Sequence, residues 1–329
     1  MLSRVANSIY WMARYIERAE NVARFLDVNY NLMLDTVGPE KEQWQPLVMT
    51  TGDQALYAKH YGRFSQDNVV RFLAIDDDNP NSILACVNAA RENARTVREI
   101  ISSEMWEQVN KFYHMVQAAA RSAAADALAY DFYTEVKLAS QLFAGISDAT
   151  MSHNEAWHFL SLGRAIERAD KTSRILDVKY FVLLPHVSDV GSTIDANQWA
   201  ALLRSASAEE MYRKRHGQIL PEKIAEFLIL DAQFPRAIAF CVNSAQESIR
   251  AVTGSPRGTF SNPAEQALGR LRAELNYATI DEIISGGLHE YLDALQLKLN
   301  RFDDAIYATF FAIRPVDAAH TQAQHQNAA

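Results

Sequence analysis

Glutamate and arginine recur at the same spacing in two segments of this chain. Residues 14–30 read RYIERAENVARFLDVNY and residues 164–180 read RAIERADKTSRILDVKY, with ten of the seventeen aligned positions identical. A glutamate carboxylate can act as a general base, and a guanidinium can hold a carboxylate or a phosphate through two parallel hydrogen bonds. Charged surface residues change freely after a duplication, so we look for function among those that match. The matched charged positions are Arg14/Arg164, Glu17/Glu167, Arg18/Arg168, Arg24/Arg174 and Asp27/Asp177.

A second pair of segments carries the same kinds of side chain. Residues 86–97 read CVNAARENARTV and residues 241–252 read CVNSAQESIRAV, with seven of twelve positions identical. Residues at i, i+4 and i+7 share one face of a helix, and polar residues occupy that spacing in both segments. Our candidates for a general base are Glu17 and Glu92. Our candidates for substrate binding are Arg14, Arg18, Arg24, Asn88, Glu92, Arg95, Arg164, Glu167, Arg168, Asn243, Glu247 and Arg250.

Three arrangements fit these charged faces. The faces could be solvated, with ion pairs between residues three or four apart that are worth about 0.2–0.5 kcal/mol each. They could be buried, where each Arg and Glu needs a partner and the network fixes how the two halves meet. They could instead line a cleft that binds an anionic ligand. Because weak exposed pairs need not keep their residue types, the matches favour a polar interior or a cleft.

Long amphipathic helices are the elements that must position these residues. On the first of them, a stripe that includes Trp11, Ile16 and Leu26 lies opposite the charged residues when successive positions are placed 100° apart. The duplication extends through Trp44/Trp199, Tyr57/Tyr212 and Phe72/Phe227, with an offset of 150 residues at the first motif and 155 from Trp44 onward. The chain has only 12 Gly and 9 Pro, and this scarcity favours helix. We therefore predict an all-α fold, an internally duplicated helical bundle with a pseudo-twofold arrangement of two roughly 150-residue repeats.

The two repeats are expected to form one domain over residues 1–313, with repeat 1 at about 1–150 and repeat 2 at about 151–313. Residues 314–329 read as a frayed tail. Within repeat 2 we expect helices to start at Pro263 and at Pro235, each proline at the first helical position, which proline favours. A break is expected at Gly286-Gly287, and the five extra residues of this repeat fall in a loop predicted at 185–198.

Composition and missing motifs exclude several classes of protein. The formal net charge of −8 argues against nucleic acid as a partner, because such binding needs a basic stripe. Cys86 and Cys241 are too few for a disulfide framework and lie on the apolar side of their helices, so we predict that they are buried. We find no signal-peptide pattern and no apolar run that could span a membrane, and we expect a cytoplasmic protein. Nucleotide-binding loops are absent, and one Glu-x-x-His, Glu155 to His158, is too little for a di-iron bundle, so we predict no metal and no intrinsic cofactor.

At IERAEN (16–21), IERADK (166–171) and ARENAR (90–95), the chain resembles the alpha-E domain family, an all-helical family named for its Glu-Arg motif. The resemblance covers the whole chain except the tail. On this resemblance the motif falls on Glu17-Arg18 and on Glu167-Arg168, and Trp106 and Asn110 follow the ARENAR segment. The second copy lacks counterparts of Arg91 and Trp106. We therefore expect a site to use the first copy more heavily.

The resemblance also implies a function. Such proteins are similar to partners of circularly permuted ATP-grasp ligases, and they are linked with transglutaminase-like peptidase systems and a proteasome-related hydrolase. This implies a component of a system that forms or modifies peptide or amino-acid amide bonds, with ATP and Mg²⁺ entering only through the partner ligase. An Arg/Glu cleft would then hold an anionic substrate or an acyl phosphate, with Glu17 or Glu92 acting on the incoming amine.

The alternative function is a non-catalytic helical scaffold or interaction protein, whose Glu-Arg motifs form an internal salt-bridge network. A nearby arginine lowers the pKa of a carboxylate and weakens it as a base, which favours glutamate as a group that orients arginine. A metal-dependent bundle oxidase is disfavoured by the missing ligands. The deciding observation is whether the arginines and glutamates converge on solvent or on one another.

Overall fold

A computed structural model describes residues 1–35, 40–122, 130–181 and 192–312, and every regular element in these ranges is a helix. The predicted all-α fold is confirmed. The first half of the chain contains α1 (Ser3–Asp35), α2 (Glu40–Thr51), α3 (Gln54–His60), α4 (Gln66–Ala74), α5 (Ile83–Thr96), α6 (Ser103–Ser122) and α7 (Tyr130–Thr150). The second half contains α8 (Glu155–Phe181), α9 (Thr193–Ser205), α10 (Glu209–His216), α11 (Pro221–Leu230), α12 (Ile238–Thr253), α13 (Pro263–Tyr277), α14 (Ile280–Ser285), α15 (Leu288–Ile306) and a π-helical turn, η2 (Tyr307–Phe311).

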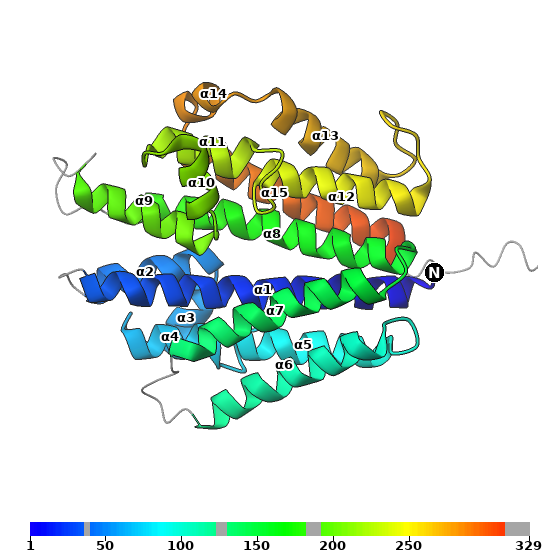
Figure 1. Cartoon of the computed structure of the whole chain (residues 1–329), viewed down its shortest axis with the longest axis horizontal. Coiled ribbons are helices and arrows are strands. Elements are labelled where there is room, and N and C mark those ends of the chain that lie inside the picture. Colours follow the sequence, from blue (N-terminus) through cyan, green and yellow to red (C-terminus); the bar gives the residue numbers. More distant parts are fainter. Residues whose placement is uncertain (36–39, 123–129, 182–191, 313–329) are drawn as a thin grey trace, which may run out of the picture.

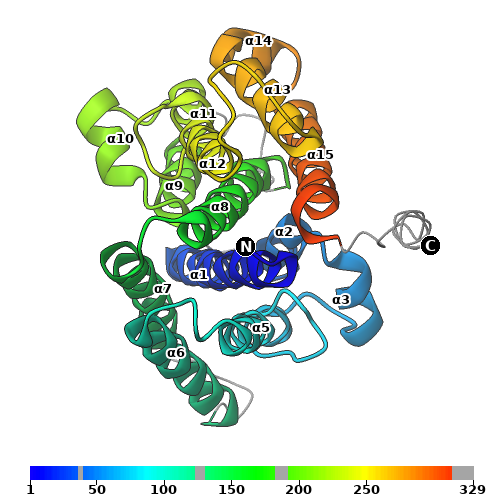
Figure 2. The same ribbon diagram turned by 90° about the vertical axis from the view of Figure 1, so that its right-hand side faces the viewer.

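The two longest helices, α1 and α8, lie side by side in the centre of the molecule (Figure 1). Helix α5 packs on the face of α1 that points away from α8, and α12 packs on the opposite face of α8 (Figure 2). Helices α6 and α13 lie outside α5 and α12, while α7 packs against α1 and α15 against α8. The central pair is therefore surrounded by helices, and most of its surface is withdrawn from water.

Small residues allow α1 and α8 to approach closely. Gly163 of α8 faces the backbone of Tyr10 on α1, and a Cβ at this glycine would lie 2.4 Å from the Tyr10 carbonyl oxygen. Ala13, Ala19 and Ala23 on α1 are at most 3% exposed. Because the side chains at the crossing are small, longer charged side chains from each helix can reach across to the other.

The charged side of α1 is buried as well as its apolar side. Glu17, Glu20 and Arg24 are between 1% and 5% exposed. A soluble-protein helix that buries all of its faces is normally apolar throughout, so these charges must be neutralised by neighbouring elements. The solvated-face arrangement therefore does not apply to α1.

Local sequence signals account for several helix ends. Asn262 caps α13, its side chain accepting from the Glu265 amide, and Pro263 occupies the first turn as predicted. The break predicted at Gly286-Gly287 separates α14 from α15. Ser82 caps α5 through the Ala85 amide, so the Asn88–Arg95 segment begins at a fixed point in the helix.

Two expectations about helix boundaries were wrong. Pro235 does not start a helix, because α12 begins at Ile238 after a turn in which the Ala237 amide donates to the Phe234 carbonyl. The loop predicted at 185–198 includes the start of α9, since Ser192 caps a helix that runs from Thr193. The rest of that loop up to residue 191, and the predicted tail at 314–329, lie outside the described residues.

Candidate functional site

The two Glu-Arg dipeptides pair with each other across the α1–α8 contact. The Arg168 guanidinium donates from Nε and Nη2 to the two carboxylate oxygens of Glu17, at 2.9 and 2.7 Å. The Arg18 guanidinium donates in the same way to Glu167, at 2.7 and 3.0 Å. Each glutamate thus pairs with the arginine of the other dipeptide. Two parallel N–H···O bonds are the strongest geometry available to such a pair.

Around Glu167 further cations close the site. The Arg14 Nε donates to the Glu167 carboxylate at 2.8 Å, and the Lys171 ammonium lies 3.5 Å from it. Arg14 also bonds through Nη1 to Asp303 of α15, which accepts from the Tyr10 hydroxyl at 2.6 Å. Helix α15 is thereby tied directly to α1 and, through Arg14, to Glu167 of α8.

Around Glu17 the additional cation comes from the turn before α12. The Arg236 guanidinium donates to the Glu17 carboxylate at 2.9 Å and also bonds Glu20. Glu20 accepts from Arg24 at 2.6 Å and from the Ser140 hydroxyl of α7 at 2.6 Å. Elements from both halves of the chain therefore meet at these two carboxylates.

The acid of α8 that aligns with Glu20 of α1 has different partners. Asp170, at the position equivalent to Glu20, accepts from Arg174 at 2.9 Å and from Lys171 at 3.0 Å. Arg174 also donates to the Thr50 carbonyl of α2 at 3.3 Å. We call the buried and partly buried set Arg14, Glu17, Arg18, Glu20, Arg24, Glu167, Arg168, Asp170, Lys171, Arg174, Arg236 and Asp303 the central network.

The electrostatics of the central network keep its carboxylates ionised. Burial by itself would raise the pKa of Glu17, but the charges of Arg168 and Arg236 outweigh it and hold the pKa well below its usual range. Burial likewise opposes ionisation of Glu167, and Arg18, Arg14 and Lys171 lower its pKa overall. A carboxylate with such a low pKa is a poor proton acceptor. Glu17 is 2% exposed and Glu167 is fully buried, so neither is presented to a substrate.

Arg164 is the member of the matched set that the network leaves out. It stands at the position equivalent to Arg14, yet in the described part of the chain it has no hydrogen bond or ion pair. It borders, with Glu17 and Ser140, a cavity of about 10 Å³ between α1, α7 and α8. Burial and the nearby charge of Arg168 lower its pKa.

The second group of candidates lies elsewhere, on the outer faces of α5 and α12. Glu92 and Arg95 form an exposed pair 2.6 Å apart, with side chains 54% and 63% exposed. Glu247 and Arg250 form the equivalent pair at 3.2 Å. Asn88 accepts from Gln117 at 3.0 Å, and Asn243 accepts from Arg272 at 2.8 Å, so both asparagines link to the neighbouring helix. The structure does not bring these residues together with Arg14, Glu17 or Arg18.

The position of Arg91 is occupied by different residue types in the two copies, as the sequence indicated. Its Nε donates to Asn110 of α6 at 2.7 Å, and its guanidinium carbon lies 4.5 Å from the centre of the Tyr113 ring. Arg98 stacks on Trp106 at 4.7 Å. These cation–π contacts fasten α5 to α6 on the first-copy side. The second copy has Gln246 in place of Arg91, and there Arg272 donates to that glutamine at 2.8 Å.

Several members of the network were missed by sequence reasoning. Glu20, Asp170 and Lys171 lie within the recognised segments but differ between the copies, so a search for identities passes over them. Arg236 and Asp303 come from other elements, 219 and 289 residues from their partners Glu17 and Arg14. The sequence offered one weak sign of Arg236: the equivalent position of the first copy, Asn81, is also polar. In the structure Asn81 accepts a hydrogen bond from Arg18 at 2.7 Å.

The remaining chemistry-bearing groups are few. Cys86 and Cys241 are buried, as predicted, and burial raises the pKa of both thiols to about 12. Among the described residues one group has the spacing of metal ligands, namely Asp177, His289 and Asp293. There the imidazole lies between the two carboxylates, Nδ1 at 2.7 Å from Asp177 and Nε2 at 3.8 Å from Asp293. With both ring nitrogens directed at carboxylates, the ring is placed as a cation.

The Glu-Arg dipeptide occurs in the sequence at 17–18 and at 167–168 and at no other place. A family model described as a predicted alpha-helical domain with a conserved ER motif matches residues 1–311. The chain belongs to the Alpha-E family. The match covers both halves of the Alpha-E chain, including every helix of the central network.

The relatives that this Alpha-E protein matches are longer. Uncharacterized proteins of Mycobacterium tuberculosis and Mycobacterium bovis are each 23% identical to it over 336 aligned residues, which cover 94% of this chain and 37% of the relative. The chain thus spans little more than a third of the length of these relatives. No solved structure matches it. Among its described helices, none has a stretch both long and apolar enough to cross a lipid bilayer.

Proposed function

We propose that this Alpha-E protein is a non-catalytic helical module of a system that forms or modifies peptide or amino-acid amide bonds, and that it acts with an ATP-grasp ligase as its partner. The partner ligase would supply ATP and Mg²⁺. The observation that carries the non-catalytic part is the reciprocal pairing of Glu17 with Arg168 and of Glu167 with Arg18. These glutamates are buried, ionised and fully engaged, so they serve as internal cross-links and offer no base to an amine.

The partner part of the proposal rests on the family resemblance. The lengths of the mycobacterial relatives support it, since each carries this region within a chain that has more than half of its residues outside the match. A region carried within longer chains is typical of a module that works beside another domain. The transglutaminase-like peptidase system is a further partner that the resemblance suggests.

We also propose that the two repeats are related by an approximate twofold axis between α1 and α8. The cross-pairing supports this relation, because a twofold axis that exchanges Glu17 with Glu167 also exchanges Arg168 with Arg18. The Arg14–Asp303 contact has no equivalent at Arg164, so the relation is approximate. The network then has the role of fixing how the two halves dock.

Reconstitution with the partner ligase tests the function. The ligase, ATP, Mg²⁺ and a pool of amino acids or peptides are incubated with and without the Alpha-E chain, and amide products and ATP turnover are measured by mass spectrometry and phosphate release. We expect product to depend on the wild-type chain. Glu92→Gln, which alters the most accessible of the candidate bases, should keep at least half of that product.

Two results would count against the proposal. Product formed equally without the chain would remove the partner role. A loss of a hundredfold or more with Glu92→Gln, in a variant whose circular dichroism and unfolding midpoint are unchanged, would make the chain a catalytic component. Glu17→Gln serves as the internal control, because its product should fall only in proportion to the unfolded fraction.

A further inference from the structure

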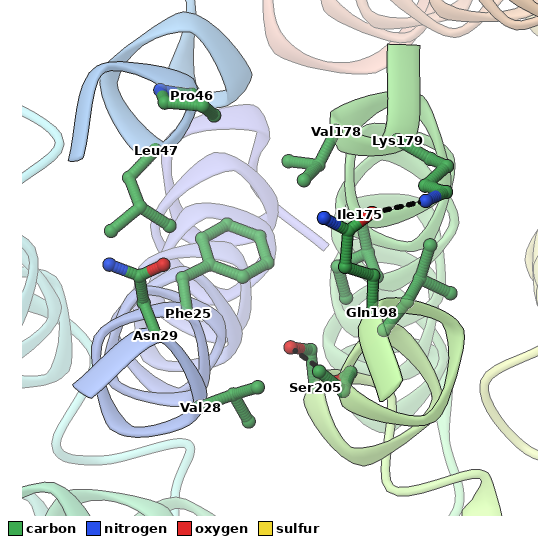
Figure 3. A pocket seen from close by; sticks show the side chains of 12 residues that line it. Phe25, Val28, Asn29, Pro46, Leu47, Ile175, Val178, Lys179, Gln198 and Ser205 are labelled. Carbon is green, nitrogen blue, oxygen red and sulfur yellow. Dashed lines mark hydrogen bonds between the residues drawn. The ribbon is translucent and has the colours of Figure 1, made fainter. Parts of the chain in front are cut away.

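A cavity of about 80 Å³ lies where the C-terminal halves of α1 and α8 meet α2 and α9 (Figure 3). In Figure 3 the side chains of α1 and α2 stand on one side and those of α8 and α9 on the other, with a shared space between them. Apolar side chains form most of its wall, among them Phe25, Leu47, Ile175 and Leu202. The pocket is partly open at the surface and larger than one water molecule, so it has room for a small ligand.

Both halves of the chain build this pocket from equivalent positions. Phe25 and Ile175, like Val28 and Val178, are 150 residues apart, and Leu47 and Leu202 are 155 apart, which are the two offsets of the duplication. The pocket is therefore a feature of the contact between the copies. It does not arise from one irregular side chain in either of them.

Some polar groups of the pocket have hydrogen-bond or ion-pair partners and others have none among the described residues. Lys179 is neutralised by Asp195 at 2.7 Å and donates to the side-chain oxygen of Gln198. The NH₂ group of that glutamine has no acceptor among the described residues. Asn29, at the position equivalent to Lys179, has a buried Nδ2 without a hydrogen-bond partner there. A buried donor with no acceptor destabilises the protein, and a ligand atom that accepts from it removes this penalty.

We propose that this pocket binds a short aliphatic group that carries a neutral carbonyl oxygen, such as a small branched amide. The volume is about half that of the roughly 150 Å³ apolar cavity known to admit benzene, so it suits an aliphatic part of about three carbons, such as the isopropyl group of isobutyramide. The side-chain NH₂ groups of Asn29 and Gln198 are the unpaired hydrogen-bonding groups, and as donors they require an acceptor on the ligand. Because Lys179 is already paired with Asp195, the pocket offers no unneutralised charge for a carboxylate.

This inference is independent of the proposed role beside a ligase, since it concerns binding by the chain alone. The test is a titration of the protein, with its Val, Leu and Ile methyl groups labelled, against isobutyramide and against isobutyrate, followed by NMR. Saturable shifts are expected at the methyl groups of Val28, Val178 and Leu202 with the amide. The carboxylate should bind at least tenfold more weakly.

Matched variants make the result specific to the pocket. Ala201 lines it and Ala196 lies on the same helix outside the lining, so Ala201→Val should abolish the saturable shifts and Ala196→Val should preserve them. Asn29→Leu should weaken the amide about tenfold, the value of one hydrogen bond, and leave folding intact because it removes an unpaired donor.

Three outcomes would overturn the binding of an amide in this pocket. The shifts could remain linear to the solubility limit, they could persist unchanged in Ala201→Val, or xenon alone could bind while the amide does not. The last result would identify a packing defect with no role for the polar groups. An equal affinity for isobutyrate and isobutyramide would overturn the assignment of a neutral ligand.

Discussion

The Glu17 carboxylate accepts two hydrogen bonds from Arg168, which is 151 residues away, and none from its chain neighbour Arg18. Consecutive residues on a helix point about 100° apart, and neither Glu-Arg dipeptide of the central pair bonds within itself. Two such dipeptides on adjacent helices can each supply a carboxylate and a guanidinium to the other. Pairing across the helices therefore satisfies all four groups and explains why both copies carry both residue types.

Replacing Glu17 with Gln should lower the free energy of unfolding by about 3–5 kcal/mol. The substitution leaves Arg168 and Arg236 buried with one carboxylate fewer between them, and an uncompensated buried charge carries a penalty of that size. Urea unfolding followed by circular dichroism provides the measurement. Glu92→Gln is the control, because it breaks an exposed pair and should change stability by no more than about 1 kcal/mol. Equal effects of the two substitutions would contradict a buried network.

Sequence reasoning could predict the helices and favoured a polar interior or a cleft for the matched charges, but it could not decide between the two. Period-3.6 patterning and the caps at Asn262 and Ser82 act locally, and they were sufficient for the all-α fold. The helical periodicity correctly placed Glu17 on the face of α1 opposite its apolar stripe. That face is buried because α8 and Arg236, far along the chain, cover it. No pattern within α1 reports on partners that are added by tertiary contact.

Arg14 and Arg164 should differ sharply when each is replaced by methionine. Arg14 is 5% exposed and bonds both Glu167 and Asp303, so its loss should cost about 3 kcal/mol by removing one of the cations around Glu167 and the cation paired with Asp303. Arg164 has no ion pair in the described structure, and its loss also relieves repulsion from Arg168, so the change should stay within about 1 kcal/mol. Chemical denaturation of both variants under one buffer decides this. A cost above 2 kcal/mol for Arg164→Met would mean that this side chain has a partner in solution.

Gly163 and Gly145 form a second matched comparison. A Cβ at Gly163 would meet the Tyr10 carbonyl oxygen at 2.4 Å, and backbone cannot yield as a flexible side chain can. We therefore expect Gly163→Ala to force α1 and α8 apart and to destabilise the protein by about 1–3 kcal/mol. Gly145 lies exposed on α7 with nothing within 4 Å of the added carbon. Gly145→Ala should raise stability by about 0.5–1 kcal/mol, because alanine favours helix.

The crossing also predicts a specific signature for Gly163→Ala. Widening the α1–α8 contact should weaken the Glu17–Arg168 bonds, so the penalty of Glu17→Gln should be smaller in the Gly163→Ala background. A double-mutant cycle measures this difference. Strict additivity of the two substitutions would show that the crossing and the network are energetically separate.

Stability should depend on pH near neutrality through His289. The Asp177 carboxylate accepts a hydrogen bond from its ring and raises the pKa of His289 above the ordinary value of about 6.5. A group whose pKa is raised by folding contributes its stabilisation fully below its unfolded pKa and loses it as pH rises through the folded pKa. The contribution of His289 should therefore decline from about pH 6.5 upward. At the equivalent position in the first copy, Asp27 pairs with Lys137 at 2.6 Å, so a lysine takes the place of the histidine there.

The comparison of wild type with His289→Gln isolates this effect from the other histidines. Burial raises the pKa of Asp177, and its hydrogen bond with His289 opposes that rise, so the acid remains dependent on the charged ring. We expect the stability difference between wild type and His289→Gln to be largest at pH 6 and to shrink toward pH 8.5, as measured by urea unfolding at each pH. His289→Lys should keep its stabilisation across the whole interval. A difference that grew with pH would reverse the sign of the linkage and would require the neutral imidazole to be the form that Asp177 and Asp293 hold.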